Sequence, residues 1–167
     1  GNGQLPQYTS CCPAWVKFAE TFYPELIPHL STAKSPIAMQ AATEKTYFAK
    51  KNNIDPNKIV SVCVTPCTAK KAEIRRPEMN SSAGYWNEEE MRDSDYSITV
   101  RELARWIRKA GLDFANLEDG KFDPLMGEAS GGGIIFANTG GVMESAMRSA
   151  YKFVTKDEVP ANLIRFD

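Results

Sequence analysis

The sequence has little of several features that mark particular classes of protein. Its 167 residues include one histidine and four cysteines, and the formal net charge at pH 7 is −1. Four clustered cysteines are too few for a secreted disulfide scaffold, so a reducing compartment with metal or redox chemistry fits better. The near-neutral charge gives no support to nucleic acid or an anionic membrane as a partner.

Long apolar runs are also missing. No run approaches the roughly 20 residues that cross a bilayer, and no signal-peptide pattern opens the chain. We therefore expect no membrane insertion and a cytoplasmic location, or a periplasmic one if the parent protein carries a signal. Hydrophobic residues make up 43% and charged residues 25%, which together with the length indicates one globular domain with a core.

Two adjacent cysteines in Thr9–Trp15 form the first candidate site. Pro13 follows them and opens an amphipathic run that predicts a helix to about residue 25, because proline is favoured at the first helical position. Cys12 then lies at the helix N-terminus, where free amides favour a metal-binding thiolate. Neighbouring cysteines cannot easily share one tetrahedral site, so we expect one ligand and one free thiol. Packing as small hydrophobic residues remains the alternative.

A third cysteine follows a predicted strand. Residues 58–65 are β-branched and nearly continuously apolar, which indicates a strand buried on both faces of a parallel sheet. Cys67 lies just beyond, where functional groups of α/β sheets gather, and Lys70 and Lys71 would favour its thiolate. A solvated surface turn is the alternative. Cys63, inside the strand, is interpreted as core.

The remaining segments predict a mixed α/β fold. Ser35-Pro36 starts a second helix, residues 75–93 are interpreted as a polar surface excursion, and residues 96–99 form a second strand. Thr99 and Glu102 form a capping box for a helix over 100–110, and its stripe is assigned to the core: Leu103, Trp106, Ile107 and Ala110.

A glycine-rich segment lies near the end of the sequence. Thr139-Gly140-Gly141 is predicted to open a helix after a short apolar strand, so that backbone amides can approach an anion or a cofactor. No Gly-Lys-Ser/Thr ending is present, which excludes a Walker phosphate loop.

Taken together, Thr9-Ser10-Cys11-Cys12-Pro13-x-Trp15, Pro66-Cys67-x-x-Lys70-Lys71-x-Glu73 and Phe136-x-x-Thr139-Gly140-Gly141-Val142-Met143-Glu144 resemble the catalytic H-cluster domain of the iron-only (di-iron) hydrogenases. Ser31-x-x-Lys34-Ser35-Pro36 and Met91-Arg92-Asp93 extend the match over nearly the whole chain. The resemblance implies an α/β fold whose mainly parallel sheet is flanked by helices, within a two-lobed domain. Residues 1–167 would be one lobe, truncated at both ends.

The resemblance also implies a chemistry. The family interconverts protons and hydrogen at a 4Fe–4S cluster joined to a di-iron subcluster that carries CO, cyanide and a bridging dithiolate. Electrons come from ferredoxin or a similar carrier.

The family's roles transfer residue by residue. Cys12 and Cys67 match two cluster ligands, and Cys11 matches the free thiol that passes protons to the dithiolate. Lys70 matches the lysine that hydrogen-bonds an iron-bound cyanide, and Ser31 and Glu73 match positions linked to outer proton relays. The positions that match the cofactor cavity are Pro36, Thr65, Phe136, Ala137 and Val142. Thr65 stands where the family commonly has methionine, and Ala137 where it usually has glycine.

Two further cysteines of the family, in a Cys-x-x-x-Cys motif, have no counterpart in the sequence. We therefore expect a fragment, inactive alone, whose partner is the remainder of the hydrogenase chain or a second subunit, and whose Lys70 faces water. The alternatives are an iron–sulfur assembly or prelamin-binding relative, a hydrogen-sensing subunit and, distantly, a zinc module. Cys11 and Lys70 argue against the assembly or prelamin-binding relative, and Thr65 leaves the hydrogen-sensing subunit open. A lone His29 argues against the zinc module.

Overall fold

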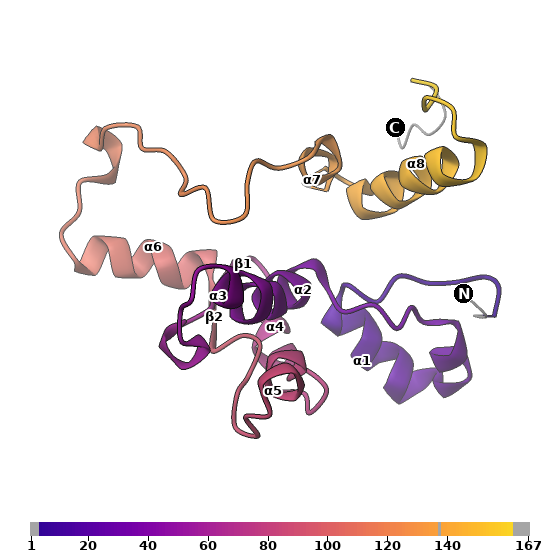
Figure 1. Cartoon of the computed structure of the whole chain (residues 1–167), viewed down its shortest axis with the longest axis horizontal. Coiled ribbons are helices and arrows are strands. Elements are labelled where there is room, and N and C mark those ends of the chain that lie inside the picture. Colours follow the sequence, from indigo (N-terminus) through magenta and orange to yellow (C-terminus); the bar gives the residue numbers. More distant parts are fainter. Residues whose placement is uncertain (1–3, 137, 162–167) are drawn as a thin grey trace. The chain divides into compact units, whose positions relative to one another are not determined.

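The computed structural model describes residues 4–136 and 138–161, which belong to two compact units, Gly1–Lys121 and Phe122–Asp167 (Figure 1). Each unit is described by itself. No helix among the described residues is both long and apolar enough to cross a membrane.

Helix α1 (Pro13–Phe22) opens the first unit as the sequence predicts. Pro13 occupies the first helical position and Cys12 is the N-cap, with its Sγ accepting from the Trp15 amide at 3.5 Å. The helix ends before the predicted residue 25, because a 3₁₀ helix, η1 (Pro24–His29), begins at the next proline. The cysteine pair is thus fixed at a helix N-terminus.

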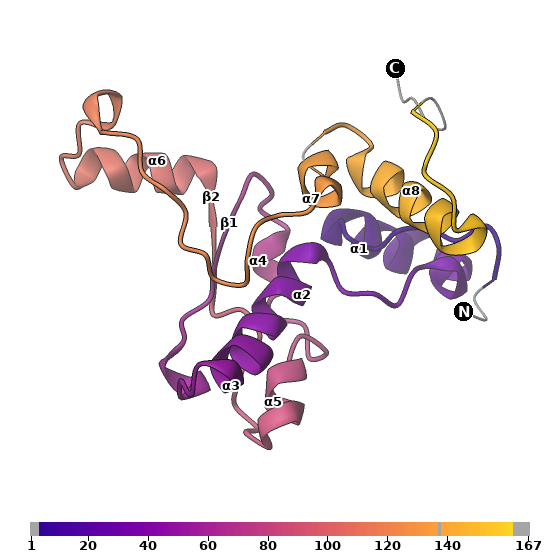
Figure 2. The same ribbon diagram turned by 45° about the horizontal axis from the view of Figure 1, so that its top comes forward.

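The second predicted helix is confirmed and continues as a longer helical rod. Helix α2 (Pro36–Thr43) starts at the Ser35 cap, whose hydroxyl accepts from the Ala38 amide at 3.3 Å. It runs on through a π turn, η2 (Glu44–Phe48), into α3 (Ala49–Lys51), and a 3₁₀ turn, η3 (Pro56–Lys58), leads to the sheet. Figure 2 shows the rod beside α5 (Ser81–Trp86).

Two parallel strands confirm the α/β class. β1 (Val62–Thr65) pairs with β2 (Tyr96–Thr99), with Cys63 opposite Ser97 and Thr65 opposite Thr99. The prediction of burial on both faces is wrong, because Cys63 and Thr65 are buried whereas Val62 and Val64 are each 48% exposed. In the described residues the sheet has only these strands, and its alternating burial shows that one face is covered.

Each strand leads into a helix. β1 is followed by the short α4 (Lys70–Glu73), and β2 by α6 (Val100–Lys109), which the predicted Thr99–Glu102 capping box begins. The predicted core stripe on α6 is wrong: no residue of α6 is buried, and Trp106 is 64% exposed. The reason is that α6 extends away from the strands that precede it (Figures 1 and 2). A 3₁₀ turn, η4 (Phe114–Asn116), lies near the end of this unit.

The segment before β2, residues 75–93, was expected at the surface; most of it is exposed, but for a few residues the expectation is wrong. Ser82, Met91 and Asp93 are buried, and Asp93 is 1% exposed. A charged residue can be buried this deeply because its carboxylate accepts hydrogen bonds from the first turn of α5 and from a lysine. The buried apolar residues are mostly small: Ala19, Ala38, Ala41, Ala49, Cys63, Ala83 and Met91.

The second unit contains α7 (Gly131–Ile135) and α8 (Gly141–Thr155). α8 opens at the glycine pair, as predicted, with Gly140 in the left-handed region at φ 72°. The predicted apolar strand before it is wrong, because residues 131–135 form a short helix capped by Ser130. Gly141 packs so closely that a Cβ there would lie 1.9 Å from the Ile135 carbonyl oxygen.

Candidate functional site

The first and second cysteine motifs meet in the first unit through one lysine. The Lys70 ammonium donates to the Cys11 carbonyl oxygen at 2.9 Å, and Lys70 is the first residue of α4, three positions after Cys67. Helices α1 and α4 are in contact. The chain turn after β1 is thereby held against the N-terminus of α1, where Cys12 caps the helix.

Lys70 does not face water, contrary to expectation. Lys70 and Glu73 are 7% and 4% exposed and form an ion pair of 2.8 Å across one helical turn. Lys71 is paired as well, with Glu102 at 2.6 Å. Both lysines that follow Cys67 are therefore engaged by carboxylates, and Lys70 is fixed by a charged partner and a carbonyl at once.

The four thiols are free and lie in different environments. Cys12 is exposed, Cys11 and Cys67 are half-buried, and Cys63 is buried. Burial raises the pKa of the Cys63 thiol, although its contact with the Ser94 hydroxyl at 3.5 Å opposes the shift. Cys63 is therefore a neutral thiol, and it lies in the core as predicted. The Cys67 amide donates to the Thr65 hydroxyl at 3.3 Å, so Thr65 braces the turn that carries Cys67.

Ser31 and Glu73 line the same cavity, which has a volume of about 340 Å³. Ser10, Lys34 and Arg76 also contribute to its wall. The Ser10 hydroxyl is within hydrogen-bond distance of the Ser31 carbonyl oxygen at 2.7 Å and of the Ala33 carbonyl oxygen at 3.0 Å. Ser31 is thus fastened to the residue that precedes Cys11, and the Ser31–Ser35 loop leads from it to Pro36 at the start of α2.

The remaining predicted site residues belong to the second unit. Phe136 is 38% exposed and Val142 is half-buried, and they flank the turn that opens α8. Glu144 and Arg148 form an ion pair of 2.8 Å along this helix. Ala137 lies outside the described residues.

Sequence reasoning missed three polar contacts in the first unit. Arg76 pairs with Glu20 of α1 at 2.7 Å, a second link between α1 and the segment after Cys67. Lys34 pairs with the buried Asp93 at 2.7 Å, and Lys45 pairs with Asp95 at 2.8 Å. Lys34 and Asp93 each belong to a motif that the sequence analysis had singled out. Nothing in the spacing of these motifs indicated that the two side chains pair.

The donor set fits part of an iron–sulfur site. In residues 4–136 and 138–161 no three or more histidine, cysteine or acidic side chains gather as a metal site. Cys12, exposed at a helix N-terminus, and Cys67, half-buried at a strand end, are thiol donors that can each take one corner of a cluster. Cys63 is buried within the strand and is not a third donor.

Comparison with known proteins identifies the family. Residues 1–166 match the family described as iron only hydrogenase large subunit, C-terminal domain, and the chain belongs to this family. It is 57% identical over 151 residues to the periplasmic Fe hydrogenase large subunit of Nitratidesulfovibrio vulgaris, covering 90% of this chain and 34% of that protein. It is 48% identical over 158 residues to iron hydrogenase 1 of Clostridium pasteurianum, covering 95% of this chain and 26% of that protein.

A solved structure and a relative from another functional class complete the comparison. The fold resembles that of an apo variant of FeFe-hydrogenase HydA1 from Chlamydomonas reinhardtii, with a TM-score of 0.78, 41% identity, and 93% of this chain and 37% of that chain covered. The chain is also 35% identical to the cytosolic Fe-S cluster assembly factor narfl of Xenopus tropicalis, over 87% of this chain and 30% of that protein. The chain thus spans about a third or less of the length of these curated relatives.

Proposed function

We propose that the chain is part of the H-cluster domain of an iron-only hydrogenase that catalyses the reversible reduction of protons to hydrogen, with ferredoxin or a similar carrier as electron partner. The observation that carries the proposal is the buried Lys70 ammonium, held between Glu73 and the Cys11 carbonyl beside the Cys67 turn. This contact brings together residues of two motifs that the family uses at one site.

Cys12 and Cys67 would hold two corners of the 4Fe–4S cluster, and the remaining ligands would come from the rest of the hydrogenase chain or a second subunit. When bound, the cluster and its di-iron partner with CO, cyanide and dithiolate supply redox-active metal for hydrogen chemistry. The α1 N-terminus supports this assignment for Cys12, because the Trp15 amide donates to its Sγ and the helix N-terminus stabilises negative charge.

The chain's own residues would handle protons and orientation. Cys11 would hold and release a proton at Sγ, because its neighbour Cys12 and not Cys11 caps the helix and serves as ligand. Ser31 would take part in the outer proton relay, and it lines the same cavity as Glu73. The ion pair of Glu73 with Lys70 supports a positioning role for Glu73, in addition to the relay role that the resemblance implies. The relay roles of Ser31 and Glu73 remain predictions.

An iron–sulfur assembly function is the second candidate, favoured by the 35% identity to the assembly factor. Assembly relatives usually lack the free thiol and the cyanide-facing lysine. This chain has both, and Lys70 contacts Cys11. Those two residues, together with 57% identity to a hydrogenase large subunit, make the hydrogenase proposal the better supported one.

Anaerobic expression of the complete reading frame with hydrogenase maturation factors, followed by assay of hydrogen evolution from a reduced dye, tests the proposal. We expect turnover above a protein-free control and its loss in a Cys67→Ala variant. Iron–sulfur absorbance without hydrogen evolution would favour the assembly function instead. The 167 residues expressed alone are expected to be inactive, because a cubane takes four protein ligands and only Cys12 and Cys67 match.

A further inference from the structure

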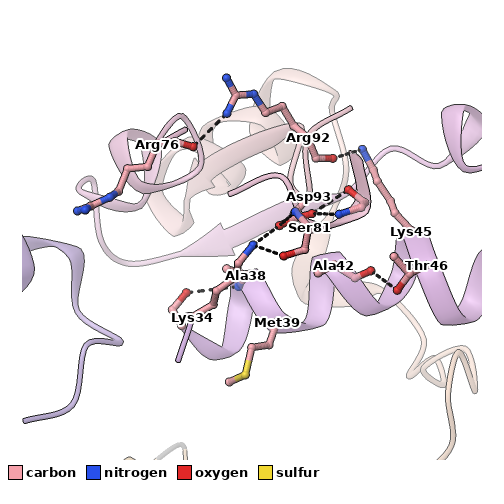
Figure 3. Close-up of polar contacts among 12 residues, drawn as sticks. Lys34, Ala38, Met39, Ala42, Lys45, Thr46, Arg76, Ser81, Arg92 and Asp93 are labelled. Carbon is pink, nitrogen blue, oxygen red and sulfur yellow. Dashed lines mark hydrogen bonds and ion pairs between the residues drawn. The ribbon is translucent and has the colours of Figure 1, made fainter. Parts of the chain in front are cut away.

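Asp93 is a buried carboxylate to which the proposed chemistry gives no role. Its Oδ1 accepts from the Ser82 amide and hydroxyl, both at 2.8 Å, and its Oδ2 accepts from the Ser81 amide at 3.1 Å and from Lys34 at 2.7 Å. Figure 3 shows the Lys34 ammonium pointing at Ser81 and Asp93. Four donors match the acceptor capacity of an ionised carboxylate.

Lys34 connects this carboxylate to the candidate site. It lies in the Ser31–Ser35 loop, between η1 and α2, and it also donates to the Ser81 hydroxyl at 2.6 Å. The other side of the loop is held by Ser10, which precedes Cys11, and by the Ser31 amide, which donates to the Tyr8 carbonyl at 2.8 Å. The loop is therefore fastened at both sides, and Ser31 and Pro36 lie at its two ends.

The segment that carries Asp93 is itself fixed. Lys45, 3% exposed in the π turn, donates to the Arg92 carbonyl at 2.8 Å (Figure 3). It also donates to Asp95 at 2.8 Å. Lys34, before the start of α2, and Lys45, in η2, thus both bind residues 92–95. Asp93 offers Lys34 a rigid partner, since its neighbours on both sides are anchored.

The surroundings of Asp93 keep its carboxylate ionised. Burial opposes ionisation of Asp93, but hydrogen bonds from Lys34, Ser82 and Ser81 outweigh it, so the pKa of Asp93 is lowered. Lys34 is 21% exposed in its side chain and belongs to the wall of the 340 Å³ cavity. The pair therefore joins the buried cap of α5 to the wall along which Ser31 lies.

We propose that Lys34 and Asp93 form a positioning pair that holds Ser31 in place beside the Cys11 segment for proton transfer. The proposal rests on the proposed hydrogenase function. It assigns the pair no contact with the cluster: it acts through the Ser31–Ser35 loop. A pair that serves only to cap α5 would stabilise the protein without affecting proton transfer.

The test compares variants of the complete, matured protein. Lys34→Met removes the link but leaves a buried charge unpaired, so the double variant Lys34→Met/Asp93→Asn, which removes both charges, is measured with it. Lys34→Arg serves as the conservative rescue. Lys17→Met, at an exposed lysine of α1, is the matched control. Each is assayed for amide hydrogen exchange of residues 31–35 and for hydrogen evolution in H₂O and D₂O.

In the double variant, we expect faster exchange at Ser31 and Ala33, turnover lower by about tenfold to a hundredfold, and a larger solvent isotope effect, because proton transfer becomes rate-limiting. Lys34→Arg should keep the exchange rates, the turnover and the isotope effect close to the wild-type values. The Lys17→Met variant should match wild type. Unchanged exchange overturns the anchoring itself, whether or not the protein evolves hydrogen. Faster exchange with unchanged turnover and isotope effect would show that the pair only stabilises the fold, and would overturn its role in proton transfer. Absence of hydrogen evolution in the wild type overturns the proposed function, while the exchange data still decide the anchoring.

Discussion

The Lys70 ammonium donates to the Cys11 carbonyl oxygen at 2.9 Å while pairing with Glu73 at 2.8 Å, and both charged residues are buried. The contact spans 59 residues and ties the segment after β1 to the start of α1. A buried ammonium with two fixed acceptors has little freedom to turn away, so Lys70 is oriented before any cofactor binds.

The first prediction concerns the stability of this pair. Lys70→Met should lower the free energy of unfolding of the apo-protein by about 3–5 kcal/mol, because it leaves the Glu73 carboxylate buried without its cation. Lys71→Met is the matched control: its pair with Glu102 is 41% and 34% exposed and screened by solvent, so the loss should be much smaller. Urea unfolding measures the free energy of unfolding of both variants. Equal losses would contradict the conclusion that the Lys70–Glu73 pair is buried and the Lys71–Glu102 pair is not.

The second prediction separates the adjacent cysteines in the matured protein. Cys11→Ser should keep the iron–sulfur EPR signal but lower turnover by at least about a hundredfold, because a hydroxyl is a far weaker acid than a thiol. Cys12→Ser should lose the signal itself. If Cys11→Ser abolishes the signal, the two roles have been assigned the wrong way round.

The third prediction is a pH dependence at the start of α6. The hydrogen bond from Lys71 and that from the Thr99 amide lower the pKa of Glu102 to about 2, from a usual value of 4.5. Because the folded-state pKa is the lower one, Glu102 stabilises the fold fully above about pH 4.5, and this stabilisation is lost as the pH falls toward 2. Glu102→Gln retains a capping side chain but should show a shallower loss of stability in this range.

Urea unfolding at several pH values between 5 and 2 checks this, with Glu88→Gln, at an exposed carboxylate, as the control that keeps the wild-type slope. The same slope in both variants would mean that the Lys71–Glu102 contact does not persist in solution.

The fourth prediction concerns the glycine pair before α8. Gly141→Ala should displace the turn from α7 and weaken the second unit, because the new Cβ would lie 1.9 Å from the Ile135 carbonyl oxygen, a backbone atom that cannot simply rotate away. Gly131→Ala, with open space around its added Cβ, should be tolerated. Limited proteolysis compares the two, and equal resistance to cleavage would contradict the close packing at Gly141.

Local signals in the sequence predicted three helix starts and both strands of the first unit. Pro13, the Ser35-Pro36 pair and the Thr99–Glu102 box act within one turn of the backbone, and each begins a helix where predicted. The burial of Cys63 also followed from its place in the strand. These features depend on neighbours in sequence, which a pattern can reveal.

Burial and long-range contacts could not be predicted in the same way. Val64 and Trp106 are apolar, yet they remain largely exposed, because burial depends on whether another element covers them. Conversely, Asp93 looked like a surface residue and is buried, since its donors come from Lys34, 59 residues away, and from α5. The contact between Lys70 and Cys11 was hidden for the same reason: only the fold brings the two motifs together.

The infrared spectrum of the complete, anaerobically matured protein tests the central claim most directly, because only a cluster with iron-bound CO and cyanide absorbs in the metal-carbonyl and cyanide stretching region. The account predicts these bands in the wild type, their loss in Cys67→Ala, and a shift of the cyanide bands in Lys70→Met, whose side chain cannot donate to cyanide. Iron–sulfur absorbance without any carbonyl or cyanide band would contradict the hydrogenase proposal.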